Sequence, residues 1–271
     1  EKLISIDFKG NIEDYSFKAY QKNSGHKING FCMQCEQKNI HLSPEDSNFK
    51  LQHISHGSTS KDFFEATDTK VSDLDKDWKN EGVVFIMESP SIDWGFYEKH
   101  TFDGITKKPT NEWYWIHDIK EKYQYPQEFK GGRYGSLFNS VIFSFKLKNA
   151  YFTNLVKCGM NNNEGNCKGL ESYNGKCVDN CFSHFLKEEI KIVSPKVIFC
   201  FGSMVLNNFN HRFKDETVKV IGLPHPAGRR RGFKDEYYRH LYFTTILEGL
   251  YEAGIYSMEE TKEKFEQFLK K

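Results

Sequence analysis

The sequence predicts a three-layer α/β/α fold with a central, mostly parallel sheet, and a small N-terminal appendage held by metal. Short apolar runs of strand length recur from Val83 onward, and segments with helical spacing separate them. Strands that alternate with helices are typical of parallel α/β domains. A chain of 271 residues can form one large domain with a small addition. We therefore divide it into an appendage, residues 1–80, and an α/β domain, residues 81–271.

The appendage is polar, rich in Lys, Asp and Ser, and poor in long apolar runs. Such a segment buries too little apolar surface to fold without help. We therefore expect it to be irregular, to wrap the α/β domain and to be held by a metal ion.

The central sheet is predicted from five apolar runs. In chain order they are "VVFIM" at 83, "VIFSFKL" at 141, "YFTNLV" at 151, "KVIFCFG" at 196 and "VKVIGLP" at 218. We expect about four strands, mostly parallel, with helices on both faces. The first run breaks into Glu-Ser-Pro-Ser, which predicts a core strand followed by a tight loop.

Helices are predicted between and after these strands. "CFSHFLKEEIKIV", residues 181–193, has apolar residues at helical spacing, and Pro195 ends it. "SMVLNNF" after Gly202 predicts a short helix capped by Ser203. "EYYRHLYFTTILEGLYEAG" predicts a longer helix closed by Gly254, and "SMEETKEKFEQFLKK" a final one.

Charge, apolar length and aromatic content limit the classes of function that the protein could have. The 38 Lys+Arg and 37 Asp+Glu leave a net charge of +1, so any basic surface must be local. No segment has the apolar length needed to span a bilayer, and no signal peptide opens the sequence, so we expect a cytoplasmic protein without a membrane partner. No obligatory protein partner is inferred. Aromatic residues make up 15% of the chain, and flat rings suit both a core and stacking against bases.

The seven cysteines indicate metal binding, because clustered cysteines in a reducing compartment bind metal more often than they form disulfides. Two four-ligand sets suit zinc. One is a C-x2-C-x17-H-x2-H pattern, and the other lies in a Gly/Asn-rich insertion at 158–181. The first set comprises Cys32, Cys35, His53 and His56, and the second Cys158, Cys167, Cys177 and Cys181. Cys200 lies in an apolar strand and is assigned to packing.

Four pieces of the sequence, taken in order, carry a resemblance to a known family. They are "MESPS", "YFTNLVKC", "CFSHFLKEEIKIVSPKVIFCFGSMVLNNF" and "VIGLPHPAGRRRG". Together they resemble the uracil-DNA glycosylase superfamily over about residues 82–250, and most closely its iron–sulfur-containing thermophile-type branch. "MESPS" stands where that branch has Gly-Glu-Ala-Pro-Gly, so Met87 and Ser91 replace both glycines.

The resemblance implies hydrolysis of a base–sugar bond in DNA. This reaction develops positive charge on the sugar and negative charge on the departing base. Glu88 would stabilise the cation and orient water, and His225 would donate a hydrogen bond to the base. Asn154 offers both an acceptor and donors for the edge of a flipped pyrimidine. From residue type alone, a turn histidine and a strand-end asparagine with only structural roles remain open.

Further residues are assigned to base and DNA contacts. "EFKGGRYGSLF" loosely echoes the family loop that supplies a stacking ring, which points to Phe129, and Ser89 is grouped with base recognition. Basic residues immediately follow the His-Pro pair and could hold phosphates, although such a run can equally be a solvated face. These basic residues are Arg229, Arg230, Arg231 and Lys234.

The resemblance also implies another metal grouping, one [4Fe–4S] cluster held by Cys32, Cys35, Cys158 and Cys181. Two other functions stay open at this point. One is a glycosylase for a bulky modified cytosine, for example in phage DNA, which the two lost glycines would permit. The other is a non-catalytic, zinc-containing DNA-binding protein.

Overall fold

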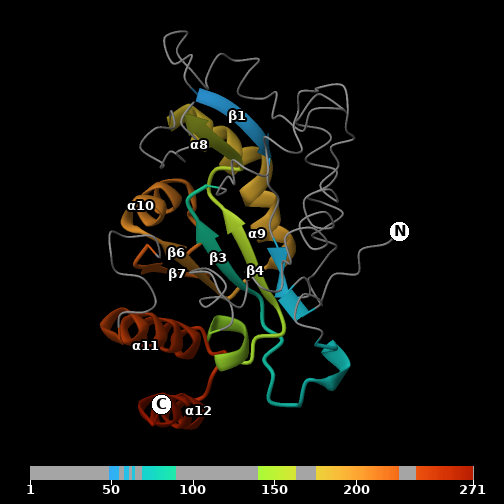
Figure 1. Cartoon of the computed structure of the whole chain (residues 1–271), viewed down its shortest axis with the longest axis vertical. Helices are drawn as coiled ribbons and strands as arrows, with labels where there is room; N and C mark the ends of the chain where they lie inside the picture. The colour runs from blue at the N-terminus through green and yellow to red at the C-terminus, as the bar shows by residue number, and fades with distance from the viewer. Residues whose placement is uncertain are drawn as a thin grey trace.

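A computed structural model gives the fold of the chain. The structure describes residues 49–54, 58–60, 63–64, 69–89, 140–162, 175–225 and 236–270. Its centre is a sheet in the order β2-β4-β3-β6-β7 (Figure 1). The four longer strands are β3 (Val83–Met87), β4 (Ala150–Asn154), β6 (Val197–Phe201) and β7 (Lys219–Leu223). All four run parallel, which confirms the predicted α/β class with its mostly parallel sheet.

Two short additions border the sheet. The two-residue β2 (Ser58–Thr59) pairs antiparallel with β4 at one edge. A separate two-stranded sheet joins β1 (Phe49–Ile54) and β5 (Cys158–Asn162), also antiparallel. The other edge of the central sheet is β7, which pairs only with β6 in the part of the chain that the structure describes.

One face of the sheet carries an aromatic core. Phe85 of β3 stacks on Phe152 of β4 at 4.9 Å between ring centroids and on Phe199 of β6 at 5.2 Å. Helix α11 (Glu236–Glu252) and the short π-helical segment η3 (Ser140–Ser144) cover these rings. Phe63 and Phe64, from the N-terminal segment, are buried in the same cluster.

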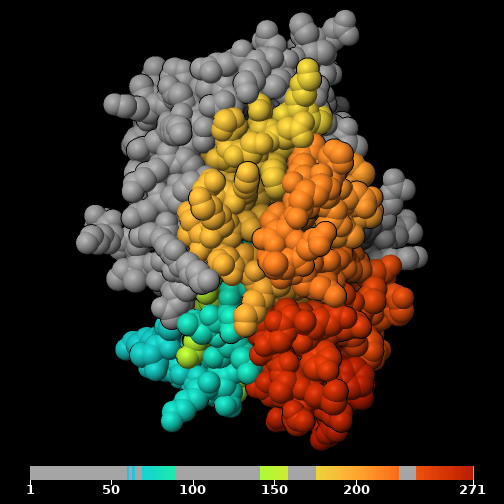
Figure 2. All heavy atoms as spheres, turned by 180° about the vertical axis from the view of Figure 1, so that it is seen from behind, coloured from blue at the N-terminus to red at the C-terminus, as the bar shows by residue number. Residues whose placement is uncertain are grey.

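The opposite face packs against helices from the middle of the chain. α8 (Gly175–Cys181), the π-helical turn η5 (Phe182–Leu186) and α9 (Lys187–Val193) follow one another without a break. They and α10 (Ser203–Arg212) bury the alternate side chains of the strands, among them Val84, Ile86 and Ile198. In Figure 2 the yellow and orange atoms of the segment that includes α8 to α10 lie beside the red atoms of α11 and α12. The three layers are therefore those that the sequence predicts.

The last helix, α12 (Met258–Leu269), begins with a capping box in which Ser257 and Glu260 bond each other's backbone N–H. It packs against α11 through Phe268, whose ring stacks on Phe243 with centroids 4.0 Å apart. Lys79 binds Glu260 at 2.5 Å and so ties the segment before β3 to this helix.

Three details differ from the predictions. The run "VIFSFKL" at 141–147 is not a strand; it forms the turn η3 and buries Val141, Ile142 and Phe145 beneath α11. Ser203 is the first residue of α10 rather than its cap, because Gly202 takes the cap position and no side chain bonds there. The helix that ends at Val193 begins at Gly175, earlier than its apolar spacing indicates.

No helix in the described ranges is both long enough and apolar enough to cross a membrane.

Candidate active site

Polar side chains that could take part in catalysis gather where the parallel strands end. Glu88 directly follows β3, Asn154 is the last residue of β4, and His225 comes two residues after β7. Because all four strands run in one direction, their carboxyl ends lie at the same edge of the sheet. Open α/β sheets bind their ligands outside this edge.

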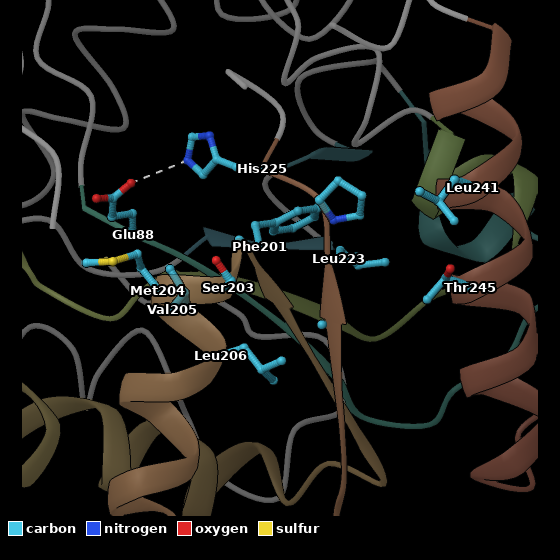
Figure 3. Close-up of a pocket in the computed structure, with 13 residues that line it drawn as sticks. Glu88, Phe201, Ser203, Met204, Val205, Leu206, Leu223, His225, Leu241 and Thr245 are labelled. Carbon is cyan, nitrogen blue, oxygen red and sulfur yellow. Dashed lines mark ion pairs between the residues drawn. The ribbon is translucent and has the colours of Figure 1, made fainter. Parts of the chain in front are cut away.

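Glu88 and His225 face each other across the ends of β3, β6 and β7. Glu88 Oε2 lies 3.5 Å from His225 Nε2, and the side chains are only 20% and 30% exposed (Figure 3). The pair is ionic when the imidazole carries two protons, and a neutral imidazole can donate to Glu88 only in the tautomer that holds its proton on Nε2. The Glu88–His225 pair brings an anionic oxygen and a nitrogen donor together in one half-buried site.

The backbone fixes the position of His225. Gly202, after β6, donates its N–H to Leu223 O at 2.6 Å, which binds the ends of β6 and β7 together. Tyr242 of α11 donates its hydroxyl to Pro224 O at 2.5 Å. Gly202 has φ of +93°, and a Cβ there would lie 3.4 Å from His225 Cβ. A glycine is therefore suited both to this backbone conformation and to the close approach of the imidazole.

A cavity of about 650 Å³ adjoins the pair. Glu88 and His225 lie at one end, while Leu241 and Thr245 of α11 lie at the other (Figure 3). Met204 at the start of α10 and Leu223 make its wall largely apolar. The volume falls within the range of about 300–1,000 Å³ usual for small-molecule sites, and such sites combine an apolar lining with a few polar groups.

Asn154 lies on the other side of Glu88, on β4, whereas the cavity extends toward β7. It is half-buried and pairs in register with Met87. The next two residues bond to the strand that leads into Glu88. Leu155 N–H donates to Met87 O at 2.8 Å and Val156 N–H to Glu88 O at 3.0 Å. Ser89 is also half-buried, one residue beyond Glu88.

Several predicted site residues lie outside the described residues. They are Phe129, Arg229, Arg230, Arg231, Lys234, Cys32, Cys35, His56 and Cys167. The structure gives the backbone alone for His53 in β1 and Cys158 in β5, and the register pairs Ile54 with Cys158. Within the ranges described, no three His, Cys, Asp or Glu side chains form a metal-binding group.

The cysteines whose side chains the structure describes are all buried. Cys177 and Cys181 lie one turn apart on α8, each 1% exposed. Lys157 N–H donates to Cys181 Sγ at 3.5 Å. Cys200 lies within β6, and burial raises the pKa of its thiol to about 12, as suits a packing residue.

Sequence reasoning missed one feature of this edge. Lys157, three residues after Asn154, forms a salt bridge of 2.6 Å with Glu189 of α9, and each side chain is 1% exposed. The available signal was the position of Glu189 on the apolar face of its helix, four residues after Phe185 and four before Val193. Fully buried Lys and Glu are rare unless they pair with each other.

Comparison with known families gives a match over most of the described α/β domain. The family model described as Uracil DNA glycosylase superfamily matches residues 80–248, which include all four parallel strands, Glu88, Asn154 and His225. A comparison with curated proteins gives no match.

Proposed function

Since the chain belongs to the uracil DNA glycosylase superfamily, whose members are typically hydrolytic DNA N-glycosylases, we propose that it removes uracil or another altered pyrimidine base from DNA. The product is an abasic site, formed by water without a covalent enzyme intermediate. The observation that supports this most is the close pair of Glu88 and His225 at the carboxyl edge of the sheet, within the matched residues.

The two members of the pair suit the two charges that develop as the bond between C1′ and the base breaks. The carboxylate of Glu88 faces the sugar, stabilises its cationic character and orients the water whose oxygen bonds to C1′. His225 donates a hydrogen bond to the base oxygen, where the negative charge of the leaving group accumulates. The apolar wall of the cavity strengthens both interactions by lowering the local dielectric.

Base recognition is assigned to Asn154, with Ser89 and Phe129 as further contacts. The amide of Asn154 can both accept from and donate to the edge of a pyrimidine, which is accessible only after the nucleotide flips out of the duplex. Its position next to Glu88 across the β3–β4 pair supports this role, because a base held there has its sugar near the carboxylate.

DNA is the partner that this reaction requires. Arg229, Arg230, Arg231 and Lys234 follow His225 within nine residues and are assigned to phosphate contacts. On a chain with a net charge of +1, such a local cluster would hold the duplex beside the site.

A structural metal centre belongs to the same proposal. The zinc set in the insertion and the [4Fe–4S] set both contain Cys158 and Cys181. Lys157 N–H donates to Cys181 Sγ, and Cys158 directly follows Lys157 in the chain, which supports a centre that includes both cysteines. Thiolates accept such N–H groups at metal centres, so these residues fit a metal. An absorbance band near 400 nm, with iron and labile sulfide, would identify the cluster, and zinc without that band the alternative.

A bulky modified cytosine is the second candidate substrate. The cavity extends from Glu88 and His225 as far as Thr245, which leaves room beside the pair for a substituent on the base. Met87 and Ser91 at the family's glycine positions agree with an altered base specificity.

One experiment separates these possibilities. Oligonucleotides that carry uracil, thymine and a panel of modified cytosines are incubated with the metal-loaded protein, and abasic sites are revealed by alkaline cleavage. Product from uracil supports the first substrate, and product only from a substituted cytosine supports the second. Binding to DNA without product from any base contradicts a glycosylase and favours a DNA-binding protein.

A further inference from the structure

A buried polar triad lies beneath the strand that carries Asn154. Lys157 Nζ binds Glu189 Oε2 at 2.6 Å and also donates to the hydroxyl of Thr153. Thr153 in turn donates to Glu189 Oε2 at 2.9 Å. The three side chains, which we call the triad, are each 1% exposed, so the hydrogen-bonded ring is closed off from water.

Stability alone does not account for the triad. Taking two charges out of water is costly, and apolar residues of similar volume often hold a protein together as well as a buried ion pair does. In some proteins a buried pair of this kind specifies a defined geometry, since each charged group is stable only when its partner is in place.

Two members of the triad lie on either side of Asn154 in the sequence. Thr153 directly precedes Asn154, and Lys157 follows it by three positions. Between them, Leu155 and Val156 donate their N–H groups to Met87 O and Glu88 O. The main-chain N–H of Lys157 is held by Cys181 Sγ at 3.5 Å. The residues on either side of Asn154 in this segment are thus bonded to β3, to Glu88 directly after it, to α8 or to α9.

The continuous helix formed by α8, η5 and α9 presents both Cys181 and Glu189 to this segment. Residues 177, 181, 185, 189 and 193 are buried at intervals of four. In a regular α-helix each such step turns about 40° past the starting face, because 3.6 residues complete a turn. The π-helical turn η5, between Cys181 and Glu189, widens the helix and reduces this drift.

We propose that Thr153, Lys157 and Glu189 are positioning residues that hold Asn154 and the backbone of Glu88 in the arrangement needed to recognise the flipped base. This inference rests on the proposed function and adds three residues that do not touch the substrate. Their effect on the reaction passes through Asn154 and Glu88.

The test replaces the whole triad, because removal of one charge would leave the other buried and unpaired. The variant Thr153→Val, Lys157→Met and Glu189→Leu keeps the volume and removes every polar group. The matched control, Glu81→Gln with Lys196→Gln, removes an exposed ion pair of 3.0 Å just before β3 and β6, at the opposite edge of the sheet. Melting temperature, kcat and KM on the preferred oligonucleotide, and amide hydrogen exchange at Leu155 and Val156 are measured for each.

We expect the triad variant to fold and to lose about a hundredfold in kcat/KM, since a displacement of about 1 Å at a site has that effect. Amide exchange at Leu155 and Val156 should become faster, while the control behaves as the parent does. Combining the triad variant with Asn154→Ala should cost less than the sum of the two separate losses, because part of the triad's effect passes through Asn154.

Three outcomes overturn the proposal. The triad variant could keep the parental kcat/KM and exchange rates, or its loss could add in full to that of Asn154→Ala, which would indicate a general structural effect. If the triad variant does not fold, Thr153→Val decides: it keeps the ion pair and the shape, and an unchanged kcat/KM would contradict positioning. If the parent protein excises no base, the proposed function fails, and the exchange rates alone decide whether the triad fixes this segment.

Discussion

Gly202 links the fold to the candidate site, and its replacement by alanine tests that link. The residue has φ of +93° and ψ of 146°, a region that side-chain-bearing residues rarely adopt. Its N–H holds Leu223 O at 2.6 Å, and its own carbonyl accepts from Leu206 N–H at 3.0 Å. An added Cβ would also touch the imidazole of His225, at 3.4 Å from Cβ and 3.5 Å from Cδ2.

The expected magnitude follows from two opposing effects. Backbone strain of this kind costs about 1–3 kcal/mol. Replacing glycine by alanine restricts the unfolded chain and returns about 0.4–1 kcal/mol. The strain in the folded state is the larger of the two effects, so Gly202→Ala should lower the free energy of unfolding by about 1–2 kcal/mol. For a domain of this size that corresponds to a fall in melting temperature of about 2–8 °C.

The rate of excision should fall as well as the stability. If the strand end relaxes to relieve the strain, His225 moves relative to Glu88, and excision should slow by about tenfold or more at a temperature where the variant is fully folded. Thermal melting and excision kinetics measure the two effects. Gly175→Ala is the matched control, because nothing lies within 4 Å of a Cβ at that helical position. A Gly202→Ala protein with the parental melting temperature and excision rate would show that the conformation of Gly202 neither requires glycine nor positions His225.

Two further predictions concern DNA binding and pH. Arg229→Ala with Arg230→Ala should weaken DNA binding at every sequence and reduce the slope of log affinity against log salt by up to about two units; an unchanged slope would make the cluster a solvated face. The hydrogen bond from Lys79, then that from the Ser257 backbone, lowers the pKa of Glu260 below its ordinary value of 4.5. Ionised Glu260 therefore stabilises the fold above that value, and this contribution is lost as the pH falls through the lowered pKa. Parent and Glu260→Gln should differ in melting temperature at pH 7 and converge as the pH falls through this lowered pKa, and a difference that stays constant on acidification would contradict this reading.

The sequence was sufficient to predict the layers because their signals are local. The strands that start at Val83 and Val197 are uninterrupted apolar runs, as strands buried on both faces require. The last helix is marked by Ser257 and Glu260, three residues apart, which form the observed capping box. Neither signal depends on the rest of the chain.

Features that depend on distant contacts were not predictable in the same way. The run at 141–147 has the composition of a strand, yet it forms a helical turn under α11 because Val141, Ile142 and Phe145 pack there. The meeting of Glu88 and His225 follows from strand order, which places β6 between β3 and β7. The salt bridge between Lys157 and Glu189 joins residues 32 positions apart, and the π-helical turn between α8 and α9 brings Cys181 and Glu189 closer to one face of the helix.

The central claim, that Glu88 and His225 carry out base excision, is tested most directly by single-turnover kinetics on an oligonucleotide with the preferred base. Glu88→Gln keeps the size of the side chain but removes the charge that faces the sugar, and His225→Ala removes the donor to the base. Each should slow the chemical step by about a hundredfold or more at an unchanged dissociation constant for DNA, because both groups act in the transition state. Two folded variants, checked by melting temperature, that cleave at the parental rate would contradict the account.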